Sequence, residues 1–88
     1  MNITDIRVKV ISKSEGKLRA VASIVFDNAF VVHDIKVIEG NSENFIVMPS
    51  RKGPDGEYHD VAHPLRSDVR EEIKELVLKA YEVALKEE

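Results

Sequence analysis

Residues 17–27, KLRAVASIVFD, carry the pattern on which the rest of the fold depends. Apolar side chains occupy every second position, and those of one parity are Leu18, Ala20, Ala22, Ile24 and Phe26. A repeat of two residues is typical of a strand with one buried and one exposed face. The sequence therefore predicts a strand here, with the core on one side of it.

The segment before it, about residues 2–12, alternates in the same way, and we expect the two to pair as a hairpin. The exposed face of this hairpin collects Arg7, Lys9, Lys17 and Arg19. In one plausible register Lys9 would face Arg19, and like charges directly opposite each other repel. We therefore expect a register shifted by two residues, in which Lys9 lies opposite Val21.

Three further strands are predicted from β-branched residues and from the turns between them, at about residues 30–38, 44–50 and 57–63. The first of these has apolar residues on both parities, which favours a central strand or one covered on both faces. Pro49 lacks an N–H for a ladder and marks a strand end or an edge. Residues 53–56, GPDG, suit a type I turn at a hairpin tip.

From Ser67 the period becomes helical, and a helix is predicted over about residues 67–86. Its apolar stripe comprises Val69, Ile73, Leu76, Val77, Ala80 and Ala84. Asp68 followed by Glu71 resembles a capping box. A neighbouring face carries Leu78, Tyr81 and Leu85, and two interpretations stay open for it: a broad buried stripe or the interface of a dimer.

These elements predict one α+β domain over residues 1–88, with a five-stranded, mainly antiparallel sheet in a hairpin meander followed by one C-terminal helix. The chain is short and its core is small, so self-association would bury useful apolar surface. The absence of cysteine excludes disulfides, zinc–thiolate sites and thiol chemistry. The charged N-terminus and the lack of a long apolar run favour a cytoplasmic protein with no membrane contact.

The formal net charge of −3 argues against a surface that attracts nucleic acid everywhere. The distribution is uneven, because residues 1–26 carry five basic and two acidic groups. Any anion-binding face must therefore be local.

Three histidines, His33, His59 and His63, raise the question of a catalytic or metal site. His33 and His59 are each followed by an aspartate, but adjacent strand residues point to opposite faces. His59 and His63 lie about 13 Å apart on a strand, which is too far to hold one ion. A cross-strand meeting of His33 with either one stays possible. We expect hydrogen bonds to carbonyls or carboxylates at strand ends, and no enzyme, metal, cofactor or small-molecule substrate.

Two stretches together resemble the SpoVG family, the stage V sporulation protein G or septation regulators. They are residues 31–40, VVHDIKVIEG, and residues 48–64, MPSRKGPDGEYHDVAHP, and the resemblance extends over essentially all 88 residues. It implies a small bacterial cytoplasmic protein that dimerises, binds DNA and RNA, and regulates septation, sporulation and gene expression. One departure is the acidic end of the chain, LKEE, so preferences for particular nucleic-acid sequences do not carry over.

The family motif's basic pair matches Arg51 and Lys52, which a hairpin tip would present to phosphates. Arg66, Arg70 and Lys74 follow at intervals of four residues near the predicted helix start, where the helix dipole favours anions. These five residues are the candidate DNA or RNA contacts, and the exposed face of the first hairpin is a weaker candidate. Tyr58 and Tyr81 stand apart from basic residues in the sequence, which disfavours base stacking. The alternative is a protein-interaction module that docks through Leu78, Tyr81 and Leu85.

Overall fold

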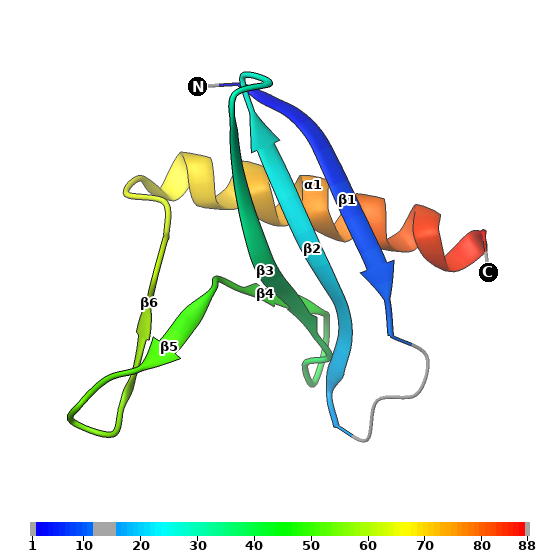
Figure 1. Cartoon of the computed structure of the whole chain (residues 1–88). Helices are drawn as coiled ribbons and strands as arrows, with labels where there is room; N and C mark the ends of the chain where they lie inside the picture. Colours follow the sequence, from blue (N-terminus) through cyan, green and yellow to red (C-terminus); the bar gives the residue numbers. More distant parts are fainter. Residues whose placement is uncertain (1, 12–15, 88) are drawn as a thin grey trace.

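The fold is a twisted antiparallel sheet crossed by one long helix, with a two-stranded ribbon projecting to the side (Figure 1). The computed structural model describes residues 2–11 and 16–87. The elements in chain order are β1 (Ile3–Val10), β2 (Leu18–Phe26), β3 (Phe30–Ile38), β4 (Phe45–Val47), β5 (Ser50–Lys52), β6 (Tyr58–Asp60) and α1 (Ser67–Lys86). The α+β class, the antiparallel pairing and the C-terminal helix are confirmed.

The prediction of a single five-stranded sheet is wrong. The strands form a four-stranded sheet in the order β1-β2-β3-β4 and a separate ribbon of β5 and β6. The predicted fourth strand breaks at Met48 and Pro49, because proline has no N–H with which to continue the ladder. The carbonyl of Pro49 instead accepts a 2.7 Å hydrogen bond from the Val61 N–H, at the base of the ribbon.

The predicted register of β1 and β2 is confirmed, since Lys9 lies opposite Val21 and not opposite Arg19. The turn expected between these strands falls almost entirely outside the described residues. The next turn is well defined, because Asp27 and Asn28 both have positive φ, at 52° and 51°. The Ala29 N–H donates to the Phe26 carbonyl across it at 2.9 Å. Positive φ at both positions is a conformation that aspartate and asparagine adopt more readily than most other residues.

The mixed parity of β3 has a specific cause. Ala22 pairs with Ile35 but Ile24 pairs with Val32, so β3 contains one extra residue, a β-bulge. Asp34 lies at this bulge and has a positive φ of 63°. Ile35 and Val37 therefore point into the core on the same side as Val32. In a regular strand, separations of three and five residues would place them on the opposite face. The strand is also interior in the sheet, between β2 and β4.

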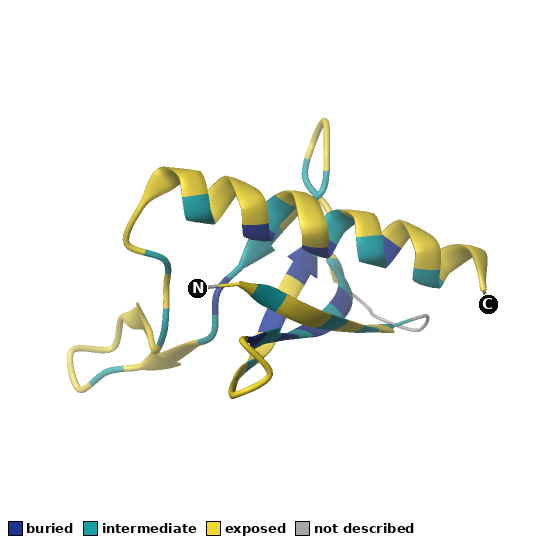
Figure 2. Ribbon diagram, turned by 90° about the horizontal axis from the view of Figure 1, so that it is seen from above, coloured by how far each residue is buried: buried dark blue, intermediate teal, exposed yellow. Residues whose placement is uncertain are grey.

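The core lies between one face of the sheet and α1, and Figure 2 shows the buried positions facing each other across this layer. The helix contributes Ile73, Val77 and Tyr81, spaced by four residues. Tyr81 is only 6% exposed, which favours the buried-stripe interpretation for it. Leu78 packs against the core, whereas Leu85 is exposed. Leu76, predicted in the stripe, is exposed on the flank of the helix.

The prediction of a capping box at the start of α1 is wrong. The N-cap of α1 is Arg66 in an extended conformation, and no side chain caps the first turn. The carboxylate of Asp68 accepts two hydrogen bonds from Arg66. Within the part of the chain that the structure describes, no helix has the length and apolarity that a membrane crossing needs.

Candidate nucleic-acid interface

The β5–β6 ribbon presents Arg51 and Lys52 to solvent. Its register places Arg51 opposite His59 and Lys52 opposite Tyr58. Consecutive strand residues point to opposite faces, so the two cations lie on different sides of the ribbon. Among the described residues neither has a carboxylate within ion-pair distance. Both are exposed and free to bind an anion.

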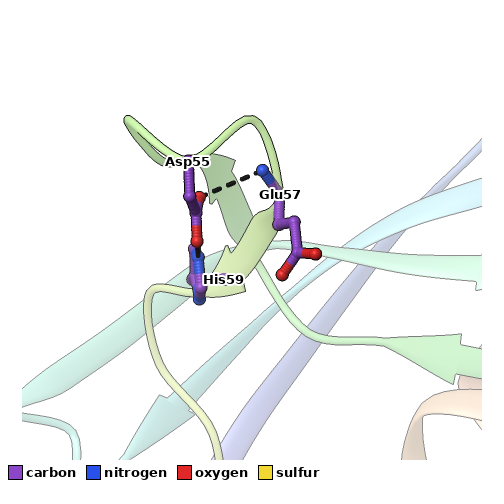
Figure 3. Close-up of side chains that lie close together, drawn as sticks. All are labelled: Asp55, Glu57 and His59. Carbon is purple, nitrogen blue, oxygen red and sulfur yellow. Dashed lines mark hydrogen bonds and ion pairs between the residues drawn. The ribbon is translucent and has the colours of Figure 1, made fainter.

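Hydrogen bonds among Asp55, Glu57 and His59, here termed the clamp, join the two sides of the ribbon tip (Figure 3). The carboxylate of Asp55 accepts a hydrogen bond from the Glu57 N–H at 3.1 Å and pairs with His59 Nε2 at 3.0 Å. Gly56 has a φ of 85°, a backbone conformation that would be strained for a residue with a side chain. A Cβ on Gly53 would lie 2.9 Å from the His59 ring. The clamp therefore holds the strands that carry the basic pair in one geometry.

The same three side chains bring a possible set of metal ligands together. Donor atoms of Asp55, Glu57 and His59 lie within 4.8 Å of one another. This cluster was not predicted from the sequence, because His59 was considered with Asp60 and with the other two histidines but not with the acidic residues before it, and alternation at positions 55, 57 and 59 was the available signal. All three residues are exposed, and the hydrogen bonds of the tip account for the approach of Asp55 to His59.

Acid should loosen the tip. Hydrogen bonds from the Glu57 N–H, and then from His59, lower the pKa of Asp55 below its ordinary value of 3.8. A lowered pKa means that the ionised carboxylate stabilises the folded tip above about pH 3.8, and this contribution disappears as pH falls through the folded pKa. We expect the Glu57 amide resonance to move in this acid range. Asp55→Asn should abolish that acid titration, and an unchanged titration in the variant would contradict the clamp.

Two of the three candidates at and near the start of α1 have carboxylate partners. Arg66 makes a two-bond pair with Asp68, at 3.0 Å from Nε and 3.2 Å from Nη2. Arg66 thereby lowers the pKa of Asp68. Lys74 Nζ lies 3.7 Å from a carboxylate oxygen of Glu43. Arg70 is exposed and has no ion pair among the described residues. Of the five candidate contacts, Arg51 and Lys52 on the ribbon and Arg70 on the helix thus have no ion pair among the described residues.

Each histidine has a local hydrogen-bond partner. His63 Nδ1 lies 3.1 Å from the Pro64 carbonyl, and His59 bonds the Asp55 carboxylate, as expected. His33 Nδ1 instead shares a 2.8 Å hydrogen bond with the Ser23 hydroxyl on the adjacent strand. The cross-strand meeting of His33 with His59 or His63 is not formed, since β3 pairs only with β2 and β4.

The sheet face opposite α1 is uncovered and bears mixed charge. Arg7 pairs with Asp5 at 3.0 Å, and Arg19 pairs with Glu39 at 2.7 Å. Lys9 is exposed between them without a carboxylate partner among the described residues. Exposed pairs of this kind contribute little to stability and exchange readily for other partners.

A groove of about 710 Å³ separates this sheet face from the base of the ribbon. One wall is β3, including Val31, His33 and Lys36, and the other contains Ser50 and Val61. This groove was not predicted from the sequence, because it depends on the ribbon leaving the sheet at Pro49. Tyr58, which is far from basic residues along the chain, is brought directly opposite Lys52.

Comparison with known proteins agrees with the motif content. The profile of the SpoVG family matches residues 1–83. A protein of Clostridium beijerinckii is 57% identical over 88 residues, covering all of this chain and 96% of its own. A protein of Lachnospira eligens is 61% identical over 84 residues, covering 96% and 94% of the two chains. Both carry the name septation protein SpoVG. With a match over nearly its full length, the chain described here is a member of the SpoVG family.

Proposed function

We propose that this protein is a cytoplasmic, homodimeric regulator that binds DNA or RNA without catalysis, in the control of septation. The names of its relatives refer to septation, and the mode of action is inferred from the ribbon. The observation that carries the proposal is the exposed pair Arg51 and Lys52, free of carboxylates and held by a clamped tip. Arginine offers a fork to phosphate or to a guanine edge, and lysine adds a mobile charge.

Pairing of two copies would bring two sets of ribbon cations into one particle. The accessible surface is 6522 Å², whereas a folded monomer of 9.9 kDa exposes roughly 5,200 Å². The excess is similar to what one subunit buries in a dimer interface, which is about 800 Å² or more. Leu78 and Leu85 on one flank of α1 are the proposed contact, whereas burial removes Tyr81 from that surface. A dimer would present two ribbons and thus four tip cations.

A second candidate function is docking of another protein on α1. Leu76 and Val83 lie seven residues, or about two turns, apart and are 37% and 51% exposed. Together they form an apolar strip on the flank of the helix opposite to Leu85. Such docking would depend on apolar contact and only weakly on salt.

The dependence of affinity on salt distinguishes the two functions. We expect the logarithm of the association constant to fall linearly with the logarithm of salt concentration, with a slope near −2 for one ribbon and near −4 for two. Random duplex and single-stranded pools, titrated by fluorescence anisotropy at several ionic strengths, provide the measurement. A slope near zero, or no binding to either pool at low salt, would reject nucleic acid as the partner.

A further inference from the structure

Tyr58 is a large aromatic residue on an exposed hairpin, where a polar residue would be sufficient for the fold. It is 72% exposed and makes no hydrogen bond or ion pair with another described residue. The register of the ribbon places it directly across from Lys52. Directly opposite residues of an antiparallel pair share a face of the ribbon. One side of the ribbon therefore presents an aromatic ring beside an unpaired ammonium group.

This face of the ribbon is continuous with the groove. Ser50 has the same parity as Lys52 on β5, and Ser50 lines the groove. The opposite wall is β3, where Val31, His33 and Lys36 lie along the uncovered sheet face. The volume of about 710 Å³ falls within the range of roughly 300–1,000 Å³ that ligand sites occupy. The groove and the ribbon face thus form one track, apolar in its middle and basic toward both ends.

The charges along the track suit a flexible anionic polymer better than a flat anionic surface. Three lysines around it lack a carboxylate partner among the described residues: Lys9, Lys36 and Lys52. Two carboxylates, Asp34 and Asp60, are also unpaired there. The balance is slightly positive, with separate cations and apolar side chains between them. Phosphates spaced along a flexible strand can meet separate cations while the bases cover the apolar part.

We propose that Tyr58 is a stacking platform for an unpaired base and that this track binds single-stranded nucleic acid. The inference rests on the proposed function and specifies the strandedness of its ligand. In a duplex each internal base is already stacked on its neighbours, so the ring of Tyr58 gains a partner only where bases are free. Lys52 then binds the phosphate next to the stacked base, and Lys36 binds one farther along the strand.

The test compares two replacements of the ring. Tyr58→Leu keeps an apolar side chain but removes the aromatic face, whereas Tyr58→Phe keeps the face. We expect Tyr58→Leu to weaken binding of a fluorescein-labelled twelve-residue oligothymidine by roughly five- to hundredfold, since stacking is a large part of single-strand affinity. Tyr58→Phe should bind within about twofold of the parent. Affinity for a duplex of the same length should change little in either variant.

Tyrosine fluorescence gives an independent readout. The chain has two tyrosines and no tryptophan, so in a Tyr81→Phe background all the emission comes from Tyr58. Oligothymidine should quench that emission at the concentrations that saturate the anisotropy signal. Lys36→Gln should weaken single-strand binding, and Lys79→Gln, an exposed lysine on the helix, is its matched control.

Several results would overturn the proposal. One is equal binding of oligothymidine by Tyr58→Leu and the parent, and another is an equal loss of duplex and single-strand affinity. A third is a Val61→Ser variant that binds oligothymidine normally but has a lower mass by light scattering, because the groove would then join two copies. If duplex binding remains and depends on Arg51, these results reject the stacking site alone. Absence of binding to both nucleic acids rejects the proposed function as well.

Discussion

Tyr81→Glu is expected to leave the domain unfolded. The side chain is 6% exposed and packs in the layer between α1 and the sheet, together with Ile73 and Val77. A buried, unpaired carboxylate costs several kcal/mol, and loss of the ring adds a cavity. Stabilities of small domains are about 5–15 kcal/mol, so the variant has little or no margin left. Far-UV circular dichroism and urea unfolding would measure the effect.

Leu85→Glu is the matched control, because the residue lies one turn farther along the same helix and is 42% exposed. We expect it to unfold at nearly the urea concentration of the parent. If the helix flank joins two copies, this variant should stay folded while its mass by light scattering falls to that of a monomer. A folded, cooperative Tyr81→Glu variant would show that the ring is not part of the core.

The double variant Arg51→Ala, Lys52→Ala should weaken nucleic-acid binding by roughly ten- to hundredfold, because charge-assisted contacts contribute about 1 kcal/mol or more each. The loss should be similar across sequences if the contacts are to phosphate, and the salt slope should become shallower by about two per ribbon. Folding should be intact, since both side chains are exposed and unpaired. Anisotropy titrations and urea unfolding give the two measurements.

Lys79→Ala with Lys86→Ala changes the net charge by the same amount at exposed helix positions. We expect this control to affect affinity only slightly, through the general field of the molecule. Equal losses in the two double variants would mean that net charge, and no specific ribbon contact, governs binding.

The sequence contained enough information for the pairing of the first two strands, but not for the division into a sheet and a ribbon or for the site. Local alternation and the repulsion between Lys9 and Arg19 were sufficient to predict the pairing of β1 with β2, because register is a short-range property. The free state of Arg51 and Lys52 fits their place on an exposed hairpin. The pairing of Arg66 with Asp68 was harder to predict, since an aspartate in the first turn can also accept from backbone N–H groups there.

Positions that depend on tertiary structure were the ones missed. Tyr81 was assigned to a neighbouring helix face, although its spacing from Val77 and Ile73 continues the buried row. The groove exists only because the chain leaves the sheet at Pro49 and returns through Val61. The proximity of Tyr58 to Lys52 depends on the register of a hairpin whose turn length could not be fixed from the sequence.

The extra residue at Asp34 has a consequence for how the chain can change in length. Deleting it would leave Val32, His33 and Ile35 in plain alternation, with His33 still beside Ser23 and with Ile35 and Val37 still toward the core. Loss of one residue here is therefore expected to be less harmful than loss of Lys36, which would turn Val37 away from the core. Evolutionary gaps within β3 should therefore fall at this position, and other gaps in the described region should gather at the connections between strands.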